Sequence, residues 1–322
     1  MKKKFIFLSL IFFTAYILFF PRDAVNAAAN GLMLWYEKVL PTLLPFAVLS
    51  NILIDSNYLQ YLNRILAPLL CRLLPVSDNG AFVLLSGFLF GFPMGSKNCA
   101  QLLKCGGITR QEADVLFVIT NNISPVFISS YILQQQLHMT KMTLISYLIL
   151  FMPPLVLGFV RLRRQVSKQS SLHSQTVQTV QTAPYLHKKP ASGSQMNFKI
   201  IDAGIMNGFE TLTRLGGYIM LFSMLASILP KLPLPEIFGI CLTGITEITN
   251  GIALLGNSDL SPGMRYILAM AFTAFGGLSG IAQTSAMVKD TGLSVKSYCI
   301  QKLVLGAVSA ALACAAVICL GI

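Results

Sequence analysis

Two polar interruptions in otherwise apolar stretches contain the residues best suited to binding a small molecule. The first, from Pro93 to Lys97, separates two apolar pieces, and the second, from Thr120 to Pro125, lies within a run of membrane-spanning length. Backbone that leaves the helix at membrane depth exposes amides and carbonyls, which are tolerated only inside protein or beside a watery cavity. Transporters commonly build substrate sites from broken helices, so these interruptions predict a transport site. A pair of kinked packing helices is the alternative.

Lys97 is the cation beside the first interruption, and Asn121 and Asn122 provide amides in the second. A charge inside the membrane is costly and is usually functional or paired. A lysine beside the free amides that begin a half-helix would suit a carboxylate ligand. The alternatives are a lysine that extends to the cytoplasmic interface and asparagines that only cap a kink.

A third polar interruption, from Thr243 to Gly251, contains Glu247. A buried carboxylate there could carry a coupling proton or pair with Lys97, whereas a structural pairing with Arg214 is the alternative. Glu210 and Arg214, four residues apart, could also satisfy each other on one helix face. The predicted substrate-binding residues are Pro93, Gly95, Ser96, Lys97, Thr120, Asn121, Asn122, Ser124, Glu247, Asn250 and Ser279.

The composition places these interruptions in a membrane protein. Of 322 residues, 54% are hydrophobic and 11% charged, whereas a soluble domain carries about 25% charged residues. The chain is therefore predicted to be an all-α polytopic membrane protein in contact with a lipid bilayer. Its net charge of +12 is interpreted as a topology signal rather than a nucleic-acid site. The cysteines form no CxxC pair and no nucleophile–base pair appears, so we predict no metal, no cofactor and no enzymatic activity.

The element order predicts two membrane repeats with broken helices and re-entrant hairpins. Residues 1–30 are expected to form an N-terminal anchor, with removal as a signal peptide as the alternative. Residues 31–160 form the first repeat, 161–199 a flexible basic cytoplasmic linker, and 200–322 the second repeat. Further crossings are expected at 31–54, 112–136, 142–160, 200–229, 264–288 and 297–321. Re-entrant hairpins are expected at 82–103 and 238–255.

The two repeats are predicted to be inverted. A shift of 177 residues aligns Asn30-Gly31 with Asn207-Gly208, and the later elements match in the same order. With about seven crossings, 17 basic residues, Lys302 among them, fall on the cytoplasmic side and 4 outside. This asymmetry favours halves of opposite orientation, which is typical of secondary transporters.

The stretch SGFLFGFPMGSKNCAQLL (86–103), followed by GGITRQEADVLFVITNNISPVFI (106–128), resembles the YlbJ family of sporulation integral membrane proteins, whose members carry a nucleoside-recognition domain of the Gate type. Asn30-Gly31 with Trp35, and the segment 43–46, fit the same family. Ser96 departs from it, since an alanine is expected there. The resemblance implies transport of dipicolinate, a small dicarboxylate, across the outer forespore membrane from mother cell to forespore.

Two other functions remain open at this point. One is a permease for nucleosides or another small solute, which would depend less on a cation. The other is a non-transporting assembly factor of the spore envelope, in which polar groups at the breaks would be dispensable. The sequence leaves the coupling ion, the direction and the oligomeric state open.

Overall fold

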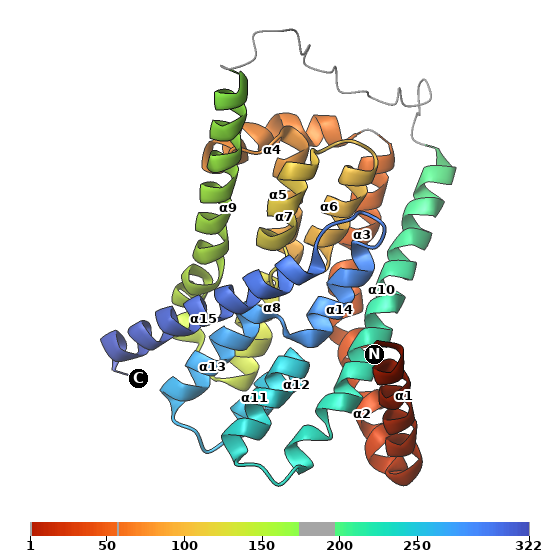
Figure 1. Cartoon of the computed structure of the whole chain (residues 1–322), viewed down its shortest axis with the longest axis vertical. Helices are drawn as coiled ribbons and strands as arrows, with labels where there is room; N and C mark the ends of the chain where they lie inside the picture. The colour runs from red at the N-terminus through yellow and green to blue at the C-terminus, as the bar shows by residue number, and fades with distance from the viewer. Residues whose placement is uncertain (1, 57, 174–196, 322) are drawn as a thin grey trace.

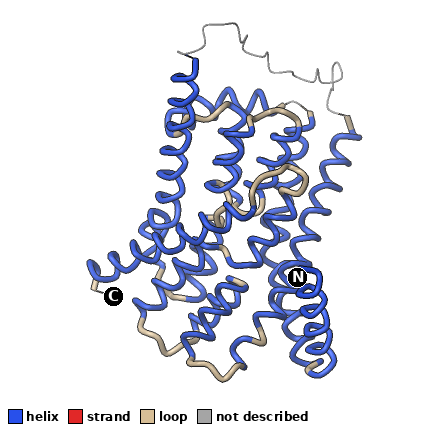
Figure 2. The backbone as a smooth tube through the Cα atoms, viewed as in Figure 1, coloured by secondary structure: helices blue, strands red, loops and turns tan. Residues whose placement is uncertain are grey.

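The computed structural model describes residues 2–56, 58–173 and 197–321, and helices dominate these stretches (Figures 1 and 2). Helix is the only regular secondary structure within them. Five helical segments are long and apolar enough to cross a membrane, or six if the bent pair 59–73 and 78–90 counts as one. The predicted all-α polytopic membrane fold is therefore confirmed.

The elements follow the predicted order. The first half contains α1 (Lys2–Phe19), α2 (Pro21–Leu34), the π-helix η1 (Trp35–Val39), α3 (Leu40–Asp55), α4 (Leu59–Leu73), α5 (Asp78–Phe90), α6 (Met94–Lys104), α7 (Arg110–Ile119), α8 (Pro125–Phe127), the π-helix η2 (Ile128–Gln136), the short η3 (Thr140–Met142) and α9 (Thr143–His173). The second half contains α10 (Phe198–Ala226), the short η4 (Leu229–Lys231), α11 (Glu236–Thr246), α12 (Ile248–Gly256), α13 (Pro262–Phe275), α14 (Gly277–Met287) and α15 (Val295–Leu320).

The helix breaks lie where the sequence predicts them. α5 ends at Gly91, whose φ of +77° is a conformation that suits glycine, and the following Phe92–Pro93 peptide is cis. α7 ends before Thr120, and α8 begins at Pro125 with Ser124 as its N-cap. In the second half the breaks fall at Glu247 and at Gly276. Each half therefore presents a hairpin of two half-helices and then a broken helix, which confirms the predicted broken elements.

The hairpin α5–α6 lies toward one end of the molecule and the hairpin α11–α12 toward the other (Figure 1). α2 and α3 pack against α10 along one flank of the molecule, and the indole Nε1 of Trp35 donates to the Leu212 carbonyl at 2.7 Å (Figure 1). These two residues are separated by the same 177 positions that align the repeats. Close contacts flank this bond on both sides, between Gly31 and Ser223 and between Gly208 and Val48. The inverted repeat stays a prediction.

Two of the predicted crossings do not coincide with any of the five long apolar segments. The crossing at 112–136 is interrupted, so neither half has the continuous length of a spanning helix. The N-terminal run forms α1, which ends at Phe19 and packs beside α2 and against Met224 near the end of α10, where Tyr16 hydrogen-bonds Ser227 at 3.0 Å. The other predicted crossings each coincide with a long segment: Pro21–Asp55, Thr140–Gln165, Phe198–Lys231, Pro262–Met287 and Val295–Leu320.

The beginning of the predicted flexible linker is helical instead, because α9 continues to His173. Leu162 is only 3% exposed and packs in the core, and the Arg161 guanidinium hydrogen-bonds Gln301 on α15. These contacts extend the helix beyond the predicted boundary at residue 160. The middle of the linker, 174–196, lies outside the described residues.

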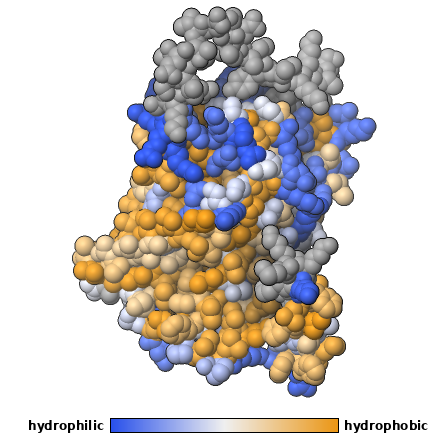
Figure 3. Space-filling model, viewed as in Figure 1, coloured by the Kyte–Doolittle hydropathy of each residue, from blue (hydrophilic) through white to orange (hydrophobic). Residues whose placement is uncertain are grey.

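The surface divides into an apolar belt and a polar end. In Figure 3 hydrophobic residues cover the middle of the visible face, and hydrophilic residues gather at the end near the tops of α9 and α10. α4 lies across this end (Figure 1). Its apolar spacing and basic Arg72 suit a helix at a membrane surface.

Candidate functional site

Asn121 joins the break between α7 and α8 to three other helices. Its Oδ1 accepts a hydrogen bond from Ser96 Oγ on α6 at 3.0 Å. Its Nδ2 donates to Thr284 Oγ1 on α14 and to the Tyr298 hydroxyl on α15, each at 2.6 Å. Asn121 is buried, so its side chain is bonded to protein and not to an open cavity in this conformation.

The neighbouring polar residues of this break are also engaged with protein. Thr120 Oγ1 donates to the Leu116 carbonyl at 2.7 Å, and Asn122 Nδ2 donates to the Ile119 carbonyl at 2.6 Å. These bonds complete the end of α7, as the capped-kink alternative expects. A direct role of Thr120, Asn121 and Asn122 in substrate binding stays a prediction.

A cation missed by the sequence analysis lies at the same break. The topology assignment puts Lys302 among the cytoplasmic basic residues, but the structure buries it, with 1% of its surface exposed. Its Nζ donates to the Asn121 carbonyl at 3.0 Å and to Asn122 Oδ1 at 3.2 Å. The available signal was its position about two turns inside the apolar helix α15, too deep for a residue at the helix end.

Glycines allow the α5–α6 hairpin to pack closely against the break between α7 and α8. A Cβ atom on Gly87 would lie 2.2 Å from the Thr120 carbonyl oxygen, and one on Gly95 would lie 2.3 Å from it. The Phe92 amide donates to the Asn122 carbonyl at 2.6 Å, and the carbonyl of buried Pro93 accepts from Ser96 Oγ at 2.9 Å. Pro93 and Gly95 therefore shape the hairpin tip, and the two breaks form one packed unit.

Glu247 lies at the equivalent break of the second half and is 2% exposed. Its carboxylate accepts from the Asn250 amide at 2.9 Å, from Asn250 Nδ2 at 3.0 Å and from the Thr249 hydroxyl, so it caps α12. Asn250 Nδ2 also lies 3.1 Å from Ser223 Oγ on α10. Glu247 thus pairs with neither Lys97 nor Arg214.

Arg214 and Ser279 are each bonded to a residue one turn away on their own helix. Arg214 forms an ion pair with Glu210 one turn away, as the alternative interpretation expects. Ser279 is buried on α14, and its Oγ accepts from Gln283 Nε2 at 3.0 Å.

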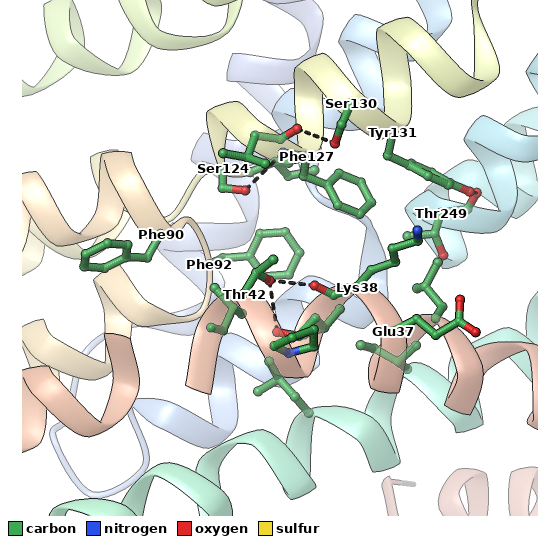
Figure 4. A pocket seen from close by; sticks show the side chains of 18 of the residues that line it. Glu37, Lys38, Thr42, Phe90, Phe92, Ser124, Phe127, Ser130, Tyr131 and Thr249 are labelled. Atoms are coloured by element: carbon green, nitrogen blue, oxygen red, sulfur yellow. Dashed lines mark hydrogen bonds between the residues drawn. The ribbon is translucent and has the colours of Figure 1, made fainter. Parts of the chain in front are cut away.

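The breaks of both halves meet at one cavity of about 640 Å³, which we call the central cavity. Phe92 and Ser124 reach it from the first half, and Glu247 and Thr249 from the second. The rings of Phe92 and Phe127 border this space in Figure 4, and the Lys38 side chain extends toward Tyr131 and Thr249. The charged residues of its lining are Glu37, Lys38 and Glu247.

A second cavity, about 470 Å³ in volume, contains Lys97 and is called here the basic cavity. Its cations come from three parts of the chain and outnumber its two acids: Lys97, Lys104, Arg214 and Lys289 against Glu210 and Asp290. The Lys97 ammonium is buried and has no hydrogen-bond partner among the described residues. It faces Asp55 and Glu210 at longer range, without forming an ion pair with either.

An apolar barrier separates the two cavities. Met94 is fully buried at the hairpin tip and packs in one cluster with Leu43, Leu212 and Leu215. Leu43 and Leu215 also line the central cavity, whereas Met287, which packs on the same cluster, lines the basic cavity. The structure therefore places Lys97 and Glu247 in different cavities on the two sides of this cluster.

Residues 37–156 match the family model described as Gate, nucleoside recognition. The chain is similar to the sporulation integral membrane protein YlbJ of Bacillus subtilis (strain 168), with 26% identity over 328 aligned residues, covering 93% of this chain and 79% of that protein. The resemblance to the YlbJ family is confirmed. The matched region contains both breaks of the first half, with the hairpin tip and Asn121. No solved structure matches the chain.

Proposed function

We propose that the protein transports a small anionic solute across a membrane. One observation carries this proposal: the tip of the first hairpin is approached by two cavities, with Phe92 lining the central cavity and Lys97 the basic cavity. The tip residue between them, Met94, is sealed in apolar packing. Two cavities that approach one broken element from different sides suit alternating access. The similarity to a sporulation membrane protein and the Gate match support solute transport or membrane assembly rather than enzymatic activity.

Dipicolinate, carried across the outer forespore membrane of sporulating cells, is the proposed substrate. Its two carboxylates suit the basic cavity, where the cations exceed the acids by two. Because Arg214 is already paired with Glu210, the unpaired and buried Lys97 is the strongest single ligand for a carboxylate. The exposed Lys104 and Lys289 at the same cavity would attract the anion before it reaches Lys97.

Uptake of labelled dipicolinate by the purified protein in liposomes tests the proposal. Replacing Lys97→Met keeps the apolar stem of the side chain and removes its charge. The loss of one charge-assisted contact is expected to weaken binding by about 10- to 150-fold. Lys104→Met, on the same helix but exposed, should have a smaller effect because water screens its charge. Unchanged uptake by the Lys97→Met protein would remove Lys97 as a ligand.

Nucleoside transport is the second candidate, and the aromatic lining of the central cavity favours it. Phe92, Phe127 and Tyr131 offer rings on which a base could stack, and the neighbouring Ser124 and Thr249 offer polar groups. Uptake of a labelled nucleoside, unaffected by excess dipicolinate, would support this function. If the protein transports neither solute, the assembly-factor alternative is favoured.

A further inference from the structure

Lys302 is a buried basic residue, and none of the three ion pairs among the described residues includes it. Its titratable neighbour is Tyr298, one turn earlier on α15, whose hydroxyl shares the Asn121 side chain with Thr284. Moving an unpaired ammonium out of water costs several kcal/mol, so such a residue needs a specific compensation.

The carboxyl end of the half-helix α7 can offset the cost of burying the Lys302 ammonium. Thr120 is the C-cap of α7, and the carbonyl of the next residue, Asn121, accepts from Lys302 Nζ. The carboxyl end of a helix carries partial negative charge, which favours a cation there. In ion-coupled transporters, carbonyls at broken helices coordinate the coupling ion. Here two oxygens, the Asn121 carbonyl and Asn122 Oδ1, face an ammonium supplied by the chain itself.

The surroundings leave this position closed to substrate in the present conformation. Lys302 is buried and lines neither the central nor the basic cavity. Its two acceptors nevertheless belong to the same packed unit as the hairpin tip, because Asn122 also accepts from the Phe92 amide. A movement of that tip must therefore strain or release the bonds of Lys302.

We propose that Lys302 is a tethered cation that occupies a monovalent-cation site at the break between α7 and α8, in place of a free coupling ion. The ammonium then holds α15 against the break, and transport requires this charge but no sodium. The transport part of this inference rests on the proposed function. The cation site itself does not.

The first test uses the proteoliposome assay. Uptake by the wild-type protein should be unchanged when choline replaces sodium on both sides. Lys302→Met should lower uptake about tenfold or more, because methionine keeps the length of the side chain and removes its charge. Lys296→Met, on the same helix but exposed, should behave like wild type. Sodium-dependent wild-type uptake, or normal uptake by the Lys302→Met protein, would overturn the inference.

The second test does not depend on transport. Lys302→Ala removes three carbons and the ammonium, a volume that n-propylammonium can refill. This cation should raise the melting temperature of the purified Lys302→Ala protein and leave that of wild type unchanged. The neutral n-propanol, which has nearly the same shape, should not reproduce the shift. Equal effects of the two molecules, or no shift with either, would refute a cation site. Wild-type protein that takes up no dipicolinate while n-propylammonium still rescues would refute only the proposed function.

Discussion

The contact between the α5–α6 hairpin and the break between α7 and α8 can be tested by adding a single methyl group. In Gly95→Ala the new Cβ would lie 2.3 Å from the Thr120 carbonyl oxygen and 2.8 Å from Thr120 Oγ1. An ordinary contact requires more than 3 Å, so α6 and the break must separate by about 1 Å. Neither neighbour can give way easily, because the atom that is met is backbone and Thr120 is fully buried.

The free-energy cost of the clash can be isolated by comparing Gly95→Ala with the same substitution at an open position. Overpacking in a well-packed interior costs about 1–3 kcal/mol, whereas alanine in place of a helical glycine gains up to about 1 kcal/mol from helix propensity. Gly217→Ala, in α10, makes the same chemical change with nothing within 4 Å of the new atom. The difference between the two variants therefore isolates the clash, at about 1–3 kcal/mol.

Thermal unfolding of the purified protein measures this difference. A change of about 1 kcal/mol shifts the melting temperature by about 2–4 °C in larger domains, so Gly95→Ala should melt about 2–12 °C below Gly217→Ala. A thiol-reactive dye is a suitable probe once the other six cysteines are replaced, because the buried Cys99 lies on α6 and reacts when this helix opens. If Gly95→Ala melts at or above Gly217→Ala, the close approach described here is wrong.

Three further outcomes are expected. Two variants with one cysteine each, Cys105 in the first and Asp259→Cys in the second, test the topology, since both positions are exposed. Cys105 should be labelled from the cytoplasmic side and Asp259→Cys from the opposite side. Labelling of both from the same side would exclude the inverted topology. Glu247→Ala should lose about 1–2 kcal/mol of stability, measured by thermal unfolding, because the cap of α12 is removed; unchanged stability would contradict this role. Val48→Cys combined with Gly208→Cys should form a disulfide between α3 and α10, since a Cβ atom placed on Gly208 would lie 2.8 Å from Val48 Cγ2. That bond should lower uptake until a reductant is added, and full uptake in the oxidised state would show that these helices do not move apart.

The breaks could be predicted from sequence because their causes are local. Gly91 with Pro93, and Ser124 with Pro125, stop and restart helices through their own backbone preferences. The apolar length of the crossings was likewise sufficient to give the membrane fold. The end of α9 could not be predicted this way, because the polar composition after residue 160 resembles a linker. Buried contacts of Leu162 with other helices decide its structure there.

The site was predictable only in part, because it depends on contacts between distant residues. The sequence identified Lys97 and Glu247 as functional candidates, but only the packing of α6 against α3, α10 and α14 shows that a barrier lies between them. Lys302 was misassigned because a basic residue near the end of a crossing ordinarily marks the cytoplasmic face. Its depth within α15 becomes informative once the partner break, 181 residues earlier at Asn121, is known.

The unequal charge of the two cavities also constrains how an anion would move. In the basic cavity the cations outnumber the acids, whereas in the central cavity Glu37 and Glu247 face the single cation Lys38. A dicarboxylate should therefore bind more tightly on the Lys97 side of the barrier and leave more readily on the Glu247 side. Such a difference cannot by itself drive net transport, because binding alone does not change the equilibrium between the two compartments. It instead lets the basic side collect solute at low concentration, while the gradient or the membrane potential sets the direction.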